Sequence, residues 1–83
     1  MYRVNLLNSA KKDLKRLDRK FQQKTVFTLH LLEKNPFWGD KMSGIFEGWY
    51  RVKIPPLRIV YTPDTKNKIV WIRAVGSRSK VYK

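Results

Sequence analysis

The sequence predicts an α+β domain in which an antiparallel β-sheet carries two N-terminal helices on one face, in the order β-α-α-β-β-β. Two observations favour this fold class. Apolar residues recur at helical spacing in the first half of the chain, and they alternate with polar residues in the second half. Pro and Gly separate the alternating segments, as is typical of strands joined by turns. With 83 residues, the chain is expected to form one domain over residues 1–83.

The chain is predicted to begin with a strand that leads into a basic helix. Tyr2, Val4 and Leu6 alternate with polar residues and are expected on one face of a strand. Asn8-Ser9 is a helix N-cap signal, and the apolar spacing after it predicts an amphipathic helix near residues 9–19.

A second helix is predicted near residues 21–34. Its apolar stripe is expected to contain Val26, Leu29 and Leu32, widened by Phe27 and Leu31. Asn35-Pro36 should end it, because the residue before a proline avoids helical backbone angles.

Three strands are predicted in the second half of the chain. They cover residues 49–54, 57–61 and 69–75, with Pro55-Pro56 and a turn over residues 63–68 between them.

The first two of these strands form a predicted hairpin whose two faces differ. If Pro55-Pro56 lies at the centre of the connection, Lys53 faces Arg58 and Arg51 faces Val60 on one side of the sheet. Because Pro cannot adopt the positive φ of tight two-residue turns, a wider loop is expected, and an odd-length loop or a bulge would change this pairing. The opposite face would then be apolar and would contact the helices; it holds Tyr50, Val52, Ile54, Leu57, Ile59 and Tyr61.

The predicted basic face has two interpretations. Like charges directly opposite in a sheet are unfavourable, and an anion between Lys53 and Arg58 would remove that cost. An ordinary solvated sheet face is the alternative. Trp49, Val60 and Thr62 make the face only partly polar, which suits a surface where bases stack and phosphates meet cations. Trp49 can equally be a packing residue.

Composition makes the whole chain basic. Lys and Arg number 19 against six Asp and Glu, which gives a net charge of +13, and the excess is spread over both halves. Such a charge favours a polyanion or an acidic protein as partner, with a merely soluble cationic surface as the alternative. The chain is too apolar for a disordered polycation, at 42% hydrophobic residues.

Composition also bears on cofactors and location. The absence of Cys and the single His argue against thiolate or imidazole metal sites, so no cofactor is expected. The chain has no apolar run long enough to span a membrane and no signal-peptide pattern, so a cytoplasmic protein with no membrane partner is expected.

Other candidate residues are weaker. His30 lies between two leucines and is interpreted as structural or simply exposed. Asp13 and Asp18 are expected to pair with neighbouring Lys and Arg residues. Glu47, the carboxylate in the loop before the basic hairpin, is a candidate general base.

Six segments, in this order, resemble the RelE-like toxins of prokaryotic type II toxin–antitoxin modules, whose fold has the same β-α-α-β-β-β order. Together they cover essentially the whole chain. The segments are residues 10–18, 32–36, 41–44, 48–53, 57–61 and 75–83, the last containing Gly76-Ser77-Arg78 and Val81-Tyr82.

The resemblance implies a function and a site. RelE-type members cut mRNA in the ribosomal A site, whereas ParE-type members share the fold, lack the ribonuclease residues and act on DNA gyrase. All five ribonuclease positions are occupied here, which favours the RelE-type activity: Arg51, Lys53, Arg58, Arg78 and Tyr82. Two departures are Arg51, where some members have Lys, and Pro55-Pro56 in place of a Gly-containing or polar turn.

The implied reaction is attack of a ribose 2′-OH on the adjacent phosphate, leaving a 2′,3′-cyclic phosphate. Arg58 would grip the phosphate and Arg78 would stabilise the leaving oxygen, while either Lys53 or Tyr82 would take the proton. The implied partners are an acidic antitoxin, mRNA on the ribosome and rRNA. A gyrase inhibitor and a non-catalytic basic nucleic-acid-binding module remain as alternatives.

Overall fold

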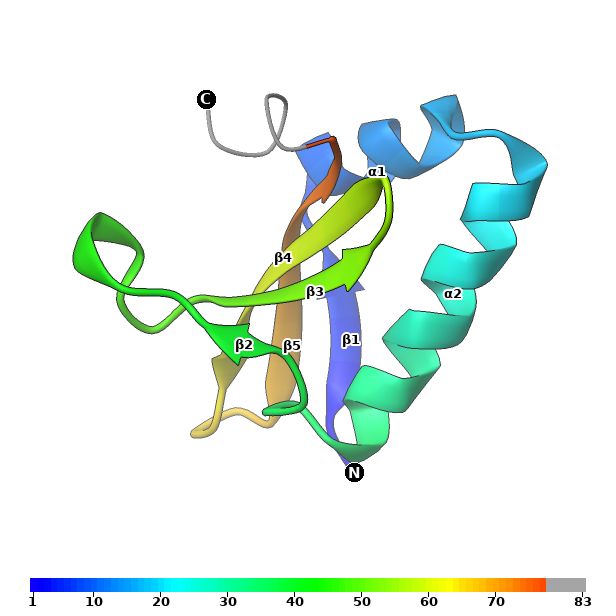
Figure 1. Ribbon diagram of the computed structural model, residues 1–83. Coiled ribbons are helices and arrows are strands. Elements are labelled where there is room, and N and C mark those ends of the chain that lie inside the picture. The colour runs from blue at the N-terminus through cyan, green and yellow to red at the C-terminus, as the bar shows by residue number, and fades with distance from the viewer. Residues whose placement is uncertain (78–83) are drawn as a thin grey trace.

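The computed structural model describes residues 1–77, in which two helices cover one face of a five-stranded sheet (Figure 1). The α+β class is therefore confirmed. The second face of the sheet carries no helix among these residues. In chain order the elements are β1 (Arg3–Leu6), α1 (Asn8–Arg16), α2 (Arg19–Lys34), β2 (Asp40–Lys41), a 3-10 turn η1 (Gly44–Phe46), β3 (Tyr50–Ile54), β4 (Leu57–Asp64) and β5 (Ile69–Gly76).

The sheet is mixed rather than wholly antiparallel. Its strand order is β1-β5-β4-β3-β2, and β1 pairs with β5 in parallel while every other pair is antiparallel. The prediction of an antiparallel sheet is thus wrong for β1. The two helices connect β1 to the rest of the sheet, and a crossover of this kind is what parallel pairing requires. The short β2 was not predicted.

Both predicted helices exist, but the first ends earlier than expected. Helix α1 stops at Arg16 because Leu17 takes an extended conformation, with φ −76° and ψ 150°. The side-chain amide of Gln22, one turn into α2, donates to the carbonyl oxygen of Leu14 at 3.0 Å. The same carbonyl accepts the backbone N–H of Leu17 at 3.2 Å, so the Gln22 side chain adds a second bond at the end of α1 and ties it to α2.

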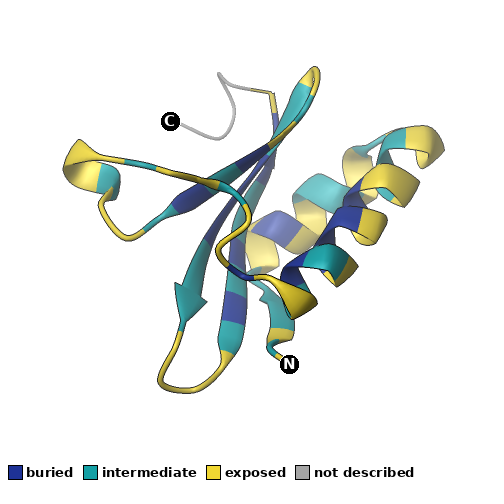
Figure 2. Ribbon diagram, turned by 60° about the horizontal axis from the view of Figure 1, so that its bottom comes forward, coloured by how far each residue is buried: buried dark blue, intermediate teal, exposed yellow. Residues whose placement is uncertain are grey.

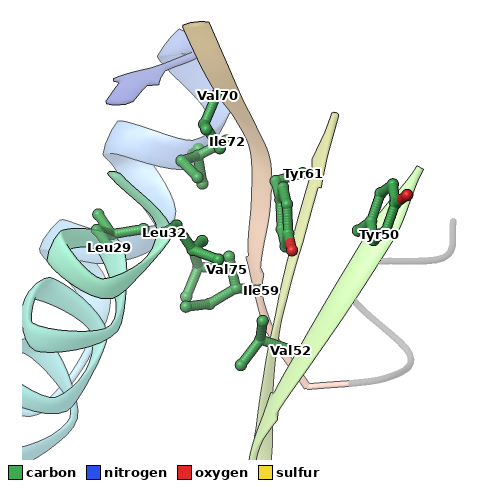
Figure 3. Close-up of a cluster of buried hydrophobic side chains, with 10 residues drawn as sticks. Leu29, Leu32, Tyr50, Val52, Ile59, Tyr61, Val70, Ile72 and Val75 are labelled. Atoms are coloured by element: carbon green, nitrogen blue, oxygen red, sulfur yellow. The ribbon is translucent and has the colours of Figure 1, made fainter. Parts of the chain in front are cut away.

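The core lies between the helices and the sheet (Figure 3). Leu29 and Leu32 of α2 and Ala10 of α1 meet the inward side chains of the strands. Tyr2, Val4 and Leu6 pack against this cluster, which confirms the predicted inward face of β1. The strand residues of the core are Tyr50, Val52, Ile59, Tyr61, Val70, Ile72 and Val75.

Helix α2 buries only part of the predicted stripe. Val26 and Phe27 are exposed, whereas Thr25 and Thr28 are buried beside Leu29 and Leu32. Figure 2 shows the buried side of the helices turned toward the sheet and the exposed side turned away from it. Thr28 tolerates burial because its hydroxyl donates to the carbonyl of Lys24 at 2.9 Å. The predicted stripe is therefore confirmed for Leu29 and Leu32 and wrong for Val26 and Phe27.

Helix α1 covers the edge of β5 beyond the point where β1 ends. The pairing of β1 reaches only Ile72, and the next backbone groups of β5 contact α1 instead. The Ser9 hydroxyl donates to the Arg73 carbonyl at 3.3 Å, and the Val75 N–H donates to the Asp13 carboxylate at 3.1 Å. Asp13 therefore accepts a backbone hydrogen bond, and within residues 1–77 it does not form the expected pair with Lys or Arg.

A tyrosine on β4 fixes the segment before β2. The N–H of Gly39 donates to the Tyr61 hydroxyl at 2.9 Å, and Tyr61 stacks on Tyr50 with ring centroids 5.6 Å apart. A side chain at Gly39 would meet the Tyr61 oxygen at 2.8 Å, so the close approach requires glycine. Burial raises the pKa of Tyr61 to about 12.

Candidate anion-binding site

The β3–β4 hairpin has the predicted register. Lys53 lies opposite Arg58, Arg51 opposite Val60, and Tyr50 opposite Tyr61. The expected wider loop is wrong: only Pro55 and Pro56 join the strands, through a cis peptide bond of the kind that defines a type VI turn. The two faces of the hairpin are therefore those predicted from residue parity.

Basic side chains from three strands, β2, β3 and β4, line one cleft on the open face of the sheet. The cleft has a volume of about 460 Å³. Arg51 and Lys53 of β3, Arg58 of β4 and Lys41 of β2 line it together with three residues of the segment between β2 and β3, Met42, Ser43 and Phe46. The structure thus brings together the three predicted site residues that it describes.

Arg58 is the most constrained of these cations. Its Nη1 is buried and has no hydrogen-bond partner among the described residues, and neither Arg58 nor Lys53 forms an ion pair there with a carboxylate. A buried donor without a partner costs about 1–3 kcal/mol, and more when the group is charged. A phosphate in the cleft would accept from that donor and would offset the repulsion between Lys53 and Arg58.

The open face also carries an arginine that the sequence analysis missed. The β4–β5 register shifts between the pairs Val60–Ala74 and Tyr61–Ile72, so Arg73 is the extra residue of a β-bulge. Its Nε donates to the Thr62 hydroxyl at 3.1 Å, and its guanidinium carbon lies 4.6 Å from the centroid of the Trp49 ring. The alternation of side chains in a sequence does not show where a bulge inserts an extra residue, so it did not predict that Arg73 lies on the open face.

The other candidate residues take surface positions. His30 is exposed and lies 3.0 Å from the Glu33 carboxylate, which the sequence analysis overlooked as its neighbour on the same helix. Asp18 is the residue before α2 and makes no side-chain capping bond. Glu47 is exposed and lines a separate cleft of about 580 Å³ next to Trp49, not the basic cleft.

Two predicted site residues, Arg78 and Tyr82, lie outside the described residues. Within residues 1–77, no group of three or more His, Cys, Asp or Glu side chains is placed to hold a metal ion. No helix in that part of the chain is both long and apolar enough to cross a membrane. What the described site offers chemically is a set of cations for binding a phosphate and stabilising added negative charge.

Comparison with solved structures identifies the fold. The chain superposes on a RelBE toxin–antitoxin complex from Mycobacterium tuberculosis with a TM-score of 0.85 and 23% identity, covering 93% of this chain and 98% of that one. It superposes on the isolated RelE toxin of E. coli with a TM-score of 0.84 and 23% identity, covering 99% and 92% of the two chains. A YoeB/ParE toxin from Agrobacterium tumefaciens gives a TM-score of 0.82 and 15% identity over 92% and 98%.

Sequence comparison supplies the family. No curated protein matches the chain. A family model does match residues 4–82, and it describes the ParE toxin of the type II toxin–antitoxin system parDE. The match spans nearly the whole sequence, and the RelE-like fold agrees with it. This chain is therefore a toxin of a type II toxin–antitoxin system, a member of the ParE toxin family within the RelE/ParE superfamily.

Proposed function

We propose that the protein is an mRNA endoribonuclease that cleaves without a metal ion, by attack of a ribose 2′-OH on the adjacent phosphate. The supporting observation is the convergence of Arg51, Lys53 and Arg58 on one cleft, with a buried nitrogen on Arg58 that has no hydrogen-bond partner in the described part of the chain. Residues 1–83 act as one domain in this proposal.

Electrostatic stabilisation would be the main source of rate. The phosphorane formed by 2′-OH attack carries more negative charge than the phosphodiester, so fixed cations bind the transition state more strongly than the substrate. Arg58 would hold two phosphate oxygens with its fork of N–H groups, and Arg51 would add a second permanent charge. Arg78 would stabilise the leaving 5′-oxygen.

Proton transfer has two candidate bases. Lys53 lies in the cleft beside Arg58, and Tyr82 follows from the resemblance to RelE-type toxins. The cleft lacks a histidine among its lining residues, so no group there has an ordinary pKa near neutrality. Catalysis would therefore depend on the ribosome, whose A site and rRNA would hold the mRNA in an attacking geometry. Ribosomes also place this activity in the cytoplasm.

An acidic antitoxin is the proposed protein partner. Similar solved structures include toxins in complex with their antitoxins, and this chain carries a net charge of +13. Ion-pair formation across such an interface weakens as salt is added. We expect a toxin–antitoxin affinity that falls with ionic strength; an affinity independent of salt would contradict this account of the partner.

Inhibition of DNA gyrase is the second candidate function. The observation that favours it is the match to a ParE family model, because ParE-type members act on gyrase. The basic residues of the cleft weigh against it, since the ParE type lacks the ribonuclease residues.

Two assays on the same purified protein separate the candidates. Primer extension on mRNA from a translating extract should show cuts at codon-related positions, while a gyrase supercoiling assay should show no inhibition. Supercoiling inhibition with intact mRNA would replace the ribonuclease by the gyrase inhibitor. The absence of both effects would leave a basic nucleic-acid-binding module.

The Tyr82→Phe variant assigns the base within the ribonuclease proposal. The substitution keeps the aromatic ring and removes only the hydroxyl. A lower cleavage rate at unchanged mRNA binding would support Tyr82 as the base. An unchanged rate would exclude it and assign the proton to Lys53.

A further inference from the structure

Three side chains, one from β5 and two from the segment between β2 and β3, form a row on the open face of the sheet. The guanidinium of Arg73 in β5 lies 4.6 Å from the Trp49 ring centroid, and the Trp49 ring lies 5.2 Å from the Phe46 ring at an angle of 58°. We call Arg73, Trp49 and Phe46 the stack. It connects the bulge of β5 to the segment between β2 and β3.

Arg73 is held in place on two sides. Its Nε donates to Thr62 on β4, and its backbone carbonyl accepts from the Ser9 hydroxyl of α1. A planar guanidinium can donate in its plane and contact an aromatic ring through its face at the same time. Arg73 therefore gives Trp49 a fixed surface against which to pack.

The segment from Met42 to Trp49, here called the loop, projects away from the rest of the protein (Figure 1). Its backbone hydrogen bonds are mostly internal, for example from the Met42 N–H to the Trp49 carbonyl and from the Trp49 N–H to the Phe46 carbonyl. Ile45 at its tip is 91% exposed. A loop with so little of its own surface buried depends on a few contacts for its position.

Phe46 is the residue through which the loop meets both the stack and the basic cleft. It contacts Trp49, and it lines the cleft together with Arg51, Lys53 and Arg58. The shape of that cleft therefore depends in part on where Phe46 sits. We infer that Arg73 is a positioning residue: through Trp49 and Phe46 it holds the loop at the distance from the sheet that an RNA phosphodiester requires.

This inference rests on the proposed ribonuclease function and deepens it. It predicts how a substitution at Arg73 would change the rate of RNA cleavage. Releasing the loop misplaces the phosphate without removing any of the cations that line the cleft. Small misplacements of a substrate can cost up to about 100-fold in rate. Binding in the ground state depends on charge and changes less.

The main test compares Arg73→Ala with Lys66→Ala, a matched loss of one positive charge in the exposed turn between β4 and β5. Amide hydrogen exchange of residues 44–48 should become faster in Arg73→Ala and stay unchanged in Lys66→Ala. The kcat for RNA cleavage should fall about 10- to 100-fold in Arg73→Ala, with a much smaller change in KM. Loop exchange as slow as in the wild type would overturn the inference, as would a fall in cleavage that Lys66→Ala reproduces.

Two further variants distinguish the loss of the contact between Arg73 and Trp49 from the loss of a positive charge and from a failure to fold. Arg73→Lys keeps the charge but loses the planar fork, so it should resemble Arg73→Ala in loop exchange. If it matches the wild type instead, Arg73 acts through its charge alone and the inference fails. Thr62→Val removes only the hydrogen bond to Arg73 and should give an intermediate exchange rate even if Arg73→Ala does not fold; no change in Thr62→Val would count against the stack.

If the protein is not a ribonuclease, the same variants give a different set of results. A wild-type protein that cuts no RNA overturns the ribonuclease proposal, and the loop exchange of the same variants still decides whether Arg73 positions the loop.

Discussion

Alternate residues of the β3–β4 hairpin form its two faces, and the two faces differ in their effect on the stability of the fold. On the face toward the helices, Val52, Ile59 and Tyr61 are buried, and the last two are wholly inaccessible. On the open face, Lys53 lies directly opposite Arg58, and one nitrogen of Arg58 is buried without a partner among residues 1–77. Burial on the first face lowers the free energy of the folded chain, whereas the pairing of Lys53 with Arg58 on the second raises it.

This contrast is informative about function because a stable hairpin has no need of the second arrangement. Opposite-charge or polar pairs would stabilise the same positions by about 0.2–1 kcal/mol each. The unfavourable pairing is offset when an anion occupies the cleft. Changes on one face should therefore affect stability and spare chemistry, and changes on the other should do the reverse.

The largest expected effect lies on the buried face. Ile59 is fully buried between the helices and the sheet, so Ile59→Ala should lower the free energy of unfolding by about 2–5 kcal/mol. Urea unfolding monitored by circular dichroism measures the loss. A loss of less than about 1 kcal/mol would mean that this face does not supply the stability assigned to it.

On the open face, Arg58→Ala should cut mRNA cleavage about 10²- to 10³-fold, the usual cost of losing one preorganised transition-state donor. Its free energy of unfolding should stay the same or rise, because the repulsion with Lys53 is gone. The matched control is Lys66→Ala, which removes the same charge from an exposed turn. Full activity in Arg58→Ala would remove the ribonuclease assignment of this face.

A smaller effect is expected where α1 meets β5. Asp13→Ala leaves the Val75 N–H without its 3.1 Å acceptor, and hydrogen bonds to charged groups contribute about 1.5–3 kcal/mol. Thermal unfolding should show a loss of this size, while Lys12→Ala on the exposed side of the same helix should change little. Equal melting temperatures for Asp13→Ala and the wild type would show that α1 does not depend on this contact.

The smallest effect depends on pH. The pKa of Tyr61 is about 12 in the folded protein and near 10.0 in an unfolded chain, because burial disfavours the phenolate. The resulting stability is fully present below pH 10 and is lost as the pH rises toward 12. Tyr61→Phe should be less stable at neutral pH by about 1 kcal/mol, since Gly39 loses its acceptor.

The same variant should also lose stability less steeply than the wild type above pH 10. Denaturant unfolding of both proteins from neutral pH to pH 12 tests this, with the lysines common to both as an internal control. Parallel curves over that range would show that Tyr61 does not titrate as its burial implies.

Residue parity in the sequence was sufficient to place the cationic cleft. Alternation fixed which side chains of residues 50–61 share a face, and a two-residue turn kept that parity, so Arg51, Lys53 and Arg58 were found together as expected. Helical spacing likewise located both helices, with errors of up to three residues at their ends. These features depend on neighbours along the chain, which the sequence displays directly.

Tertiary structure decided the features that depend on distant neighbours. Alternation gives a strand two faces but does not say which strand lies beside it, so the parallel pairing of β1 with β5 was not predictable. The bulge that presents Arg73 breaks the period-two pattern, and Asp13 found a backbone donor 62 positions away. On α2, Val26 and Phe27 face outward because the sheet covers the side of the helix that holds Thr25 and Thr28. Hydrophobicity drives burial without choosing among surfaces, and packing against the other elements makes that choice.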